Sequence, residues 1–271
     1  MTVHHPRILT GTCGYSYPEW KEAGFYCPDT PAAGMLAAYA GQFPVTELNY
    51  TWYQMPKAAA MERMRHKVPD TFLFSAKLTR KLTHEVAPGQ WRREAALYRE
   101  GVSPLVQAGQ LAAVVVQFPP SFRRTPDNRH YLAALLDEMG DLPLAVEFRH
   151  ASWATEKVYD AFAGRKVTLV TVDVPDLPWL YPWVDIVTNP EMFYVRFHGR
   201  NARGWGSGNM QHQFDYDYTD AELAAWADEK IPRMAEQARA GFLFFNNHVR
   251  AQAPKNAARL TRMLIRQGLV R

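Results

Sequence analysis

The chain alternates between short apolar runs and longer amphipathic segments. Seven of its eight apolar runs end in a polar residue at their C-terminal end. Read as strands, the runs cover 8–14, 45–49, 72–77, 113–117, 144–149, 168–173, 193–198 and 242–248. Helical segments are expected at 29–43, 56–67, 91–108, 127–139, 156–163, 219–240 and 254–267. When strands alternate with helices, polar residues at the carboxyl ends of the strands are typical of a parallel sheet whose functional site lies at those ends.

Eight strands and seven helices in alternation predict an α/β fold, a (β/α)₈ TIM-barrel-like domain. At 271 residues the chain suits one such barrel, so we interpret residues 1–271 as a single domain. The sixth crossover should be irregular. Residues 174–190 hold four prolines and two tryptophans, and proline at that density removes helical hydrogen bonds.

Composition narrows the possible partners only slightly. The formal net charge of +4 is compatible with anionic ligands or nucleic acid and requires neither. No apolar run approaches the roughly 18 residues that span a bilayer, so we expect no membrane association. The first residues have no charged segment followed by an apolar one, which predicts no signal peptide. With only Cys13 and Cys27 available, we expect a reduced, cytoplasmic protein.

Several motifs resemble the YecE-like family (domain of unknown function 72). In order, they are GTCGYSYPEW (11–20), TELN (46–49), FLFSAK (72–77), QFPP (117–120), VEFRH (146–150), RFHG (196–199) and FNNH (245–248). The resemblance covers nearly the whole chain and implies a TIM-barrel-like fold without implying an activity. It also leads us to expect serine where this chain has Cys13, whose role stays open.

One group of strand-end residues is acidic and bears histidine. Its proposed catalytic members are Glu47, Glu147, Asp173 and His198, with His248 as a further candidate. Barrels of the xylose-isomerase type resemble this arrangement and hold a divalent metal. Their last ligand, however, is a carboxylate on strand eight, where this chain has only asparagines, and amide oxygens are weaker ligands. Arginines nearby would also repel a metal ion, so we expect no metal and no cofactor.

A second group of strand-end residues is cationic and amide-bearing. Glu147 and Arg149 are two residues apart, which in a strand places them on the same face. Converging cations suit a phosphate or carboxylate, which arginine binds bidentately. The glycine-containing loop 200–208 follows strand seven, near the usual phosphate position of such barrels. The proposed substrate-binding residues are Lys77, Arg149, Arg196, Asn49, Gln117, Asn246, Asn247 and Trp20.

The preferred hypothesis is an enzyme, a hydrolase or an isomerase, that acts on an anionic, sugar-like small molecule. Glu147 or Glu47 would transfer the proton, and the sequence leaves open which is acid and which is base. The alternative is a nucleic-acid-binding protein or a metal-dependent phosphodiesterase. A third interpretation is structural: the cations at the barrel mouth merely neutralise the carboxylates. The basic residues of the last helix are interpreted as a solvated face, and the oligomeric state stays open.

Overall fold

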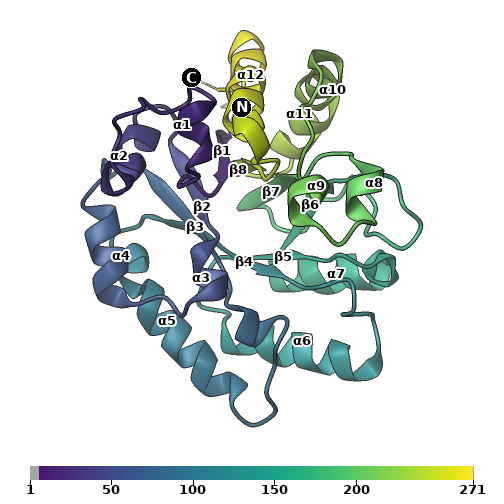
Figure 1. Cartoon of the computed structure of the whole chain (residues 1–271). Helices are drawn as coiled ribbons and strands as arrows, with labels where there is room; N and C mark the ends of the chain where they lie inside the picture. The colour runs from purple at the N-terminus through teal and green to yellow at the C-terminus, as the bar shows by residue number, and fades with distance from the viewer. Residues whose placement is uncertain (1–5, 271) are drawn as a thin grey trace, which may run out of the picture.

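Eight parallel strands form one closed barrel in the order β1 to β8 (Figure 1). The computed structural model describes residues 6–270. The strands are β1 (Arg7–Cys13), β2 (Val45–Leu48), β3 (Leu73–Lys77), β4 (Leu111–Gln117), β5 (Leu144–Glu147), β6 (Thr168–Asp173), β7 (Met192–Phe197) and β8 (Ala240–Phe245). The prediction of a (β/α)₈ barrel is confirmed. The prediction about a signal peptide concerns mainly residues 1–5, which lie outside the described residues.

The ring closes where β1 pairs with β8. Six residue pairs join these two strands, from Arg7 opposite Ala240 to Thr12 opposite Phe245. On its other side β1 approaches β2 very closely. A Cβ atom at Gly11 would lie 2.1 Å from the carbonyl oxygen of Val45. Glycine is therefore required at this point of the barrel wall.

Helices surround the barrel, and short ones follow several strands at its carboxyl end. Figure 1 shows α4, α5, α6, α7 and α12 around the strands, with α3, α8 and α9 in front of them. The helices are α1 (Glu19–Glu22), α2 (Met35–Ala40), α3 (Tyr50–Tyr53), α4 (Ala58–Arg65), α5 (Trp91–Gln107), α6 (Pro126–Glu138), α7 (Glu156–Arg165), α8 (Ala202–Trp205), α9 (Met210–Gln213), α10 (Asp220–Ala225), α11 (Ile231–Ala235) and α12 (Gln252–Arg266). Across residues 6–270, no helix combines the length and apolar character that a bilayer crossing requires.

Two expected helices differ from the sequence prediction. The segment 29–43 contains a 3₁₀ turn, Ala32–Gly34, followed by the short α2. The segment 219–240 begins with the expected capping box between Thr219 and Glu222, but a π-helical turn, Trp226–Lys230, separates α10 from α11. Pro232 has no N–H to donate to the carbonyl four residues earlier, which favours the wider turn.

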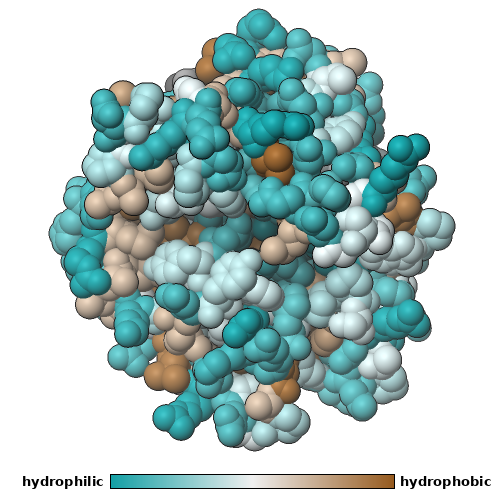
Figure 2. All heavy atoms as spheres, in the orientation of Figure 1, coloured by the Kyte–Doolittle hydropathy of each residue, from teal (hydrophilic) through white to brown (hydrophobic). Residues whose placement is uncertain are grey.

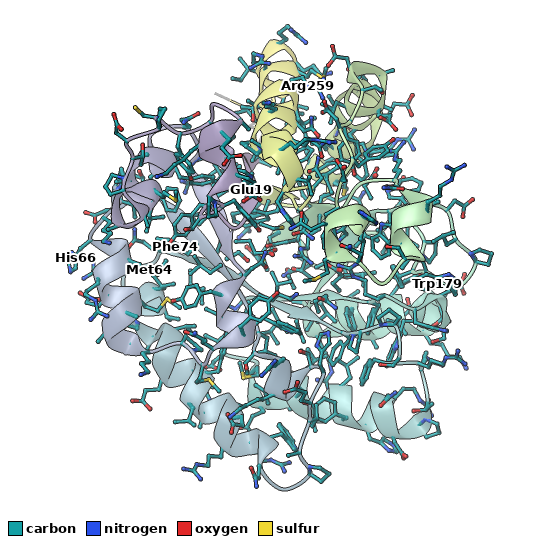
Figure 3. All side chains as sticks on the ribbon, viewed as in Figure 1. Glu19, Met64, His66, Phe74, Trp179 and Arg259 are labelled. Carbon is teal, nitrogen blue, oxygen red and sulfur yellow. The ribbon has the colours of Figure 1, made fainter. Side chains whose placement is uncertain are left out.

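The sixth crossover is irregular, as predicted. Residues 174–191 contain no helix between β6 and β7. Thr188 fixes the segment to the edge of β6, because its hydroxyl accepts from Leu169 N (2.9 Å) and donates to Val167 O (2.7 Å). Trp179 lies at the periphery of the molecule (Figure 3) and is 40% exposed. Trp179 therefore lies away from the barrel axis.

Candidate active site at the carboxyl end of the barrel

Arg196 holds two carboxylates inside the carboxyl end of the barrel. Its guanidinium donates to Glu147 Oε2 at 2.5 Å and to Glu47 Oε1 at 2.6 Å. All three side chains are essentially inaccessible to solvent, with exposed fractions of 0–1%. They come from β2, β5 and β7, so one guanidinium links strands on opposite sides of the ring. Two of the predicted acids and one predicted cation are thus brought together.

Tyr194 and Ser75 continue this network below Arg196. The Tyr194 hydroxyl lies 2.8 Å from Glu47 Oε2 and 2.9 Å from Ser75 Oγ. Both residues were absent from the predicted site. The two-residue period of a strand could have revealed Tyr194. It precedes Arg196 by two positions, so the two side chains point to the same face of β7.

Cys13 borders the same network without being reactive. Its sulfur accepts from Arg196 at 3.5 Å, and the thiol is buried. Burial, reinforced by the charge of Glu47, raises the pKa of the Cys13 thiol well above its usual value. A thiol that resists ionisation is a poor nucleophile.

Arg149 and His198 lie one or two residues beyond the ends of β5 and β7. Arg149 forms an ion pair with Glu147 Oε1, and its Nη2 lies 3.3 Å from His198 Nε2. The Asn246 amide lies 3.0 Å from His198 Nδ1. Nε2 also lies 3.3 Å from Glu147 Oε1, so it accepts from Arg149 when unprotonated and donates to Glu147 when it carries the ring proton. Glu147 is therefore the common partner of three basic side chains.

The charges of this cluster are fixed by its partners. Burial by itself raises the pKa of Glu147, but Arg149 and Arg196 outweigh burial and hold that pKa well below its usual value. For Arg196, burial is likewise outweighed by Glu147 and Glu47, and its pKa is raised. Burial and the charge of Arg149 lower the pKa of His198 to about 3, so its ring is neutral at pH 7.

Lys77, the last residue of β3, differs from the other cations of the mouth. Within residues 6–270 it has no carboxylate at ion-pairing distance, and its Nζ lies 5.0 Å from the centre of the Trp52 ring. Part of its side chain remains exposed. Burial and repulsion from Arg196 lower the pKa of Lys77 to about 7, against the opposing attraction of Glu47. This amine is therefore about half neutral at physiological pH.

Aromatic side chains line the rim of the mouth. Figure 2 shows a hollow near the centre of the face that Figure 1 presents. The guanidinium carbon of Arg149 lies 5.0 Å from the centre of the Trp205 ring. On the other side, Tyr17 stacks on His248 with ring centres 4.7 Å apart. Glu19, labelled in Figure 3, lies 3.7 Å from His248 Nδ1.

Asp173 is not part of the central cluster. Its carboxylate accepts from Arg200 at 2.8 and 2.6 Å, from the Tyr218 hydroxyl at 2.8 Å and from Trp226 Nε1 at 2.7 Å. These partners belong to the strand-seven loop and to the helical layer outside β7. Asp173 therefore faces the helices, and Arg200 of the predicted phosphate loop is occupied in neutralising it.

Four other predicted residues make no side-chain hydrogen bond to Arg196, Glu147 or Glu47. The Asn247 amide donates to Tyr216 O and to Asn256 Oδ1, both at 2.7 Å, on the helical side of the barrel. Gln117 donates to the carbonyl of its neighbour Phe118 at 2.8 Å. Trp20 is fully buried and donates to His248 O at 2.8 Å. Asn49 Oδ1 is buried without a hydrogen-bond partner among the described residues.

Metal binding finds no preformed site in the described part of the chain. Across residues 6–270, no group of three or more His, Cys, Asp or Glu side chains is arranged to hold an ion. Glu147 and His198 are close together, but Arg149 and Arg196 occupy the positions around them. The expected absence of a metal stays a prediction for the purified protein.

Comparison with known proteins identifies the family. Residues 9–270 match the family described as "Protein of unknown function DUF72". The chain belongs to the DUF72 family. A DUF72 family protein from Thermotoga maritima MSB8 has a crystal structure similar to this one, with a TM-score of 0.86 and 31% sequence identity over 96% of this chain and 99% of that chain. This agrees with the resemblance seen in the motifs.

Two further DUF72 relatives cover nearly all of the chain. A family protein from Enterococcus faecalis V583 superposes with a TM-score of 0.84 at 26% identity, covering 95% of each chain. The "UPF0759 protein YunF" of Bacillus subtilis (strain 168) is 29% identical over 253 residues, which is 88% of this chain and 89% of that protein. These relatives support the barrel fold and carry no description of an activity.

Proposed function

We propose that this DUF72 protein is an enzyme that binds a small anionic molecule at the barrel mouth and transfers a proton to or from it. One observation carries the proposal. Within residues 6–270, a lysine amine with no ion-pair partner and an arginine at the mouth lie near a buried carboxylate whose pKa is held low. Positively charged groups in a confined site attract an anion, and a group of pKa near 7 exchanges protons efficiently at neutral pH.

The roles of the charged residues follow from which of them already form ion pairs within the protein. Arg196 has both ends of its guanidinium on carboxylates and is almost fully buried. It therefore positions Glu47 and Glu147, and we no longer assign it to the ligand. Arg149 is 7% exposed, packs against Trp205 at the rim, and donates no hydrogen bond from Nη1 within residues 6–270. We assign the anion to Arg149.

Proton transfer is assigned to Lys77 in preference to the carboxylates. The pKa of Glu147 is held low, so this carboxylate is a weak base at pH 7. Its negative charge instead stabilises positive charge that develops on the substrate. The neutral imidazole of His198, bonded to Asn246, is placed to orient Glu147.

A cytoplasmic location remains part of this proposal, since Cys13 and Cys27 are both unpaired. The nucleic-acid alternative differs in its ligand and in its salt dependence. A protein that tracks phosphates along a strand loses affinity steeply as salt rises. A small anion held by one arginine has a shallow dependence.

Thermal shift and calorimetry with inorganic phosphate, pyruvate and a short single-stranded oligonucleotide test the proposal. Hydrogen bonds to charged groups contribute roughly 1.5–3 kcal/mol, so Arg149→Ala should weaken small-anion binding about tenfold or more. The matched control is Arg203→Ala, since Arg203 is exposed on the same rim and has the same charge. Equal binding by wild type and Arg149→Ala, or no stabilisation by any small anion, would show that the cations only neutralise carboxylates.

A further inference from the structure

We propose that Lys77 is a covalent site, whose amine condenses with the carbonyl group of a small aldehyde or ketone that carries a carboxylate or phosphate. This inference rests on the proposed function and adds a substrate class and a bond to it. The proposed covalent bond does not depend on which proton is transferred after the bond forms. The reasons lie in the position of the amine, in its surroundings and in the distribution of charge at the mouth.

Lys77 occupies the position that a nucleophile requires. It ends β3, and the two-residue period of the strand places it on the same side as Ser75, whose hydroxyl contacts Tyr194 inside the barrel. The side chain therefore reaches the carboxyl-end mouth. The exposed Lys81, by contrast, forms an ion pair with Glu94 at 3.1 Å.

The surroundings of Lys77 favour the neutral amine, which is the reactive form. Trp52 covers the amine on one side. Arg149 and Arg196 contribute positive charge that opposes protonation, while the carboxylates that attract a proton are themselves bonded to those arginines. The neighbouring His84 is also kept neutral, because burial and the charge of Lys77 lower its pKa to about 4.

The condensation needs no partner outside the substrate. The nitrogen lone pair of neutral Lys77 attacks the carbonyl carbon, and a proton moves from nitrogen to oxygen to give a carbinolamine. Uptake of one proton and loss of that oxygen as water then give a protonated imine. The positive charge gained at nitrogen lies near the ionised Glu147, which stabilises it. Hydrolysis by the reverse steps regenerates the amine.

The anionic group of the substrate follows from Arg149. With Arg149 holding a carboxylate or phosphate, a carbonyl group on the same small molecule is brought within the mouth that Lys77 faces. A 2-oxo acid and a phosphorylated ketone share this chemistry. The two probes in the experiment, pyruvate and dihydroxyacetone phosphate, distinguish the two sources of negative charge.

Reductive trapping tests the inference on the full-length protein. Incubation with each probe and cyanoborohydride, followed by digestion and mass spectrometry, should place the reduced adduct on Lys77. At pH 7 an exposed lysine is neutral only about one part in a few thousand, whereas Lys77 is about half neutral. We therefore expect labelling of Lys77 to exceed that of Lys81 at least about tenfold and to rise with pH to a half-maximum near 7.

Two variants separate this inference from the proposed function. Arg149→Ala should reduce labelling of Lys77 by pyruvate about tenfold more than labelling by uncharged acetaldehyde, because acetaldehyde is affected only by the lost positive charge near the amine. Lys77→Arg should keep anion-dependent stabilisation and lose the adduct. Anion binding without preferential labelling of Lys77 by either probe would overturn the covalent role and leave the proposed function standing. If the wild-type protein shows neither anion binding nor labelling of Lys77, the covalent role and the proposed function are both overturned.

Discussion

Replacing Arg196 by methionine removes the cation that two buried carboxylates share. Glu47 and Glu147 would be left in the barrel interior with fewer partners, and neither has solvent access. Removing one member of a buried ion pair costs about 3–5 kcal/mol. A domain of ordinary stability has about 5–15 kcal/mol in total. Arg196→Met should therefore lose about a fifth or more of the free energy of unfolding.

Urea denaturation, followed by tryptophan fluorescence, measures this loss as a change in midpoint at constant slope. The matched control is Arg239→Met, because Arg239 pairs with Glu191 at 3.1 Å on the surface, with 67% of its side chain exposed. Exposed pairs contribute about 0–1 kcal/mol. Combining Arg196→Met with Glu47→Gln should recover part of the loss, since Glu47 is then uncharged and Glu147 keeps Arg149 as its partner. An Arg196→Met protein within 1 kcal/mol of the control would refute the buried-charge reasoning.

Two further predictions concern acid and metal. Because the folded pKa of Glu147 is lowered from its usual 4.5, its ionisation stabilises the fold above about pH 4.5, and this stability is lost as pH falls toward the folded value. Urea midpoints from pH 7 to pH 3 should therefore fall more steeply for wild type than for Glu147→Gln, and parallel curves would contradict this. Elemental analysis should find well under one Mn, Zn or Co per chain. About one ion per chain, lost in Asp173→Ala, would be the contrary result.

The barrel was predictable because its strand and helix signals are repetitive. Apolar runs, seven of them with polar ends, predicted all eight strands, and the prolines of residues 174–190 predicted the missing sixth helix. Local propensity could not give the π-helical turn at Trp226–Lys230. That turn depends on how Pro232 is accommodated within an otherwise continuous helix.

The site was predictable only in part, because both faces of a barrel strand are buried. Every residue of β6 is buried, so its sequence shows no alternation to tell whether Asp173 faces the axis or the helices. The same ambiguity applies to Asn246 and Asn247, of which one contacts His198 and the other contacts the helical layer. The sequence also does not show which arginine is fully engaged by carboxylates of the protein. Arg196 and Arg149 are alike in sequence context and differ in how many carboxylates reach them.

Closure of the ring between β1 and β8 has a consequence for the order of folding. These strands are separated by more than 200 residues of chain, and contacts of such long range form slowly. During synthesis β1 leaves the ribosome long before β8 and must wait for it. Glu47 on β2 meets Arg196 on β7 across that same junction. Until β1 pairs with β8, the side chains of Glu47 and Arg196 remain separated and hydrated in the nascent chain. Their ion pair therefore forms only when the barrel closes.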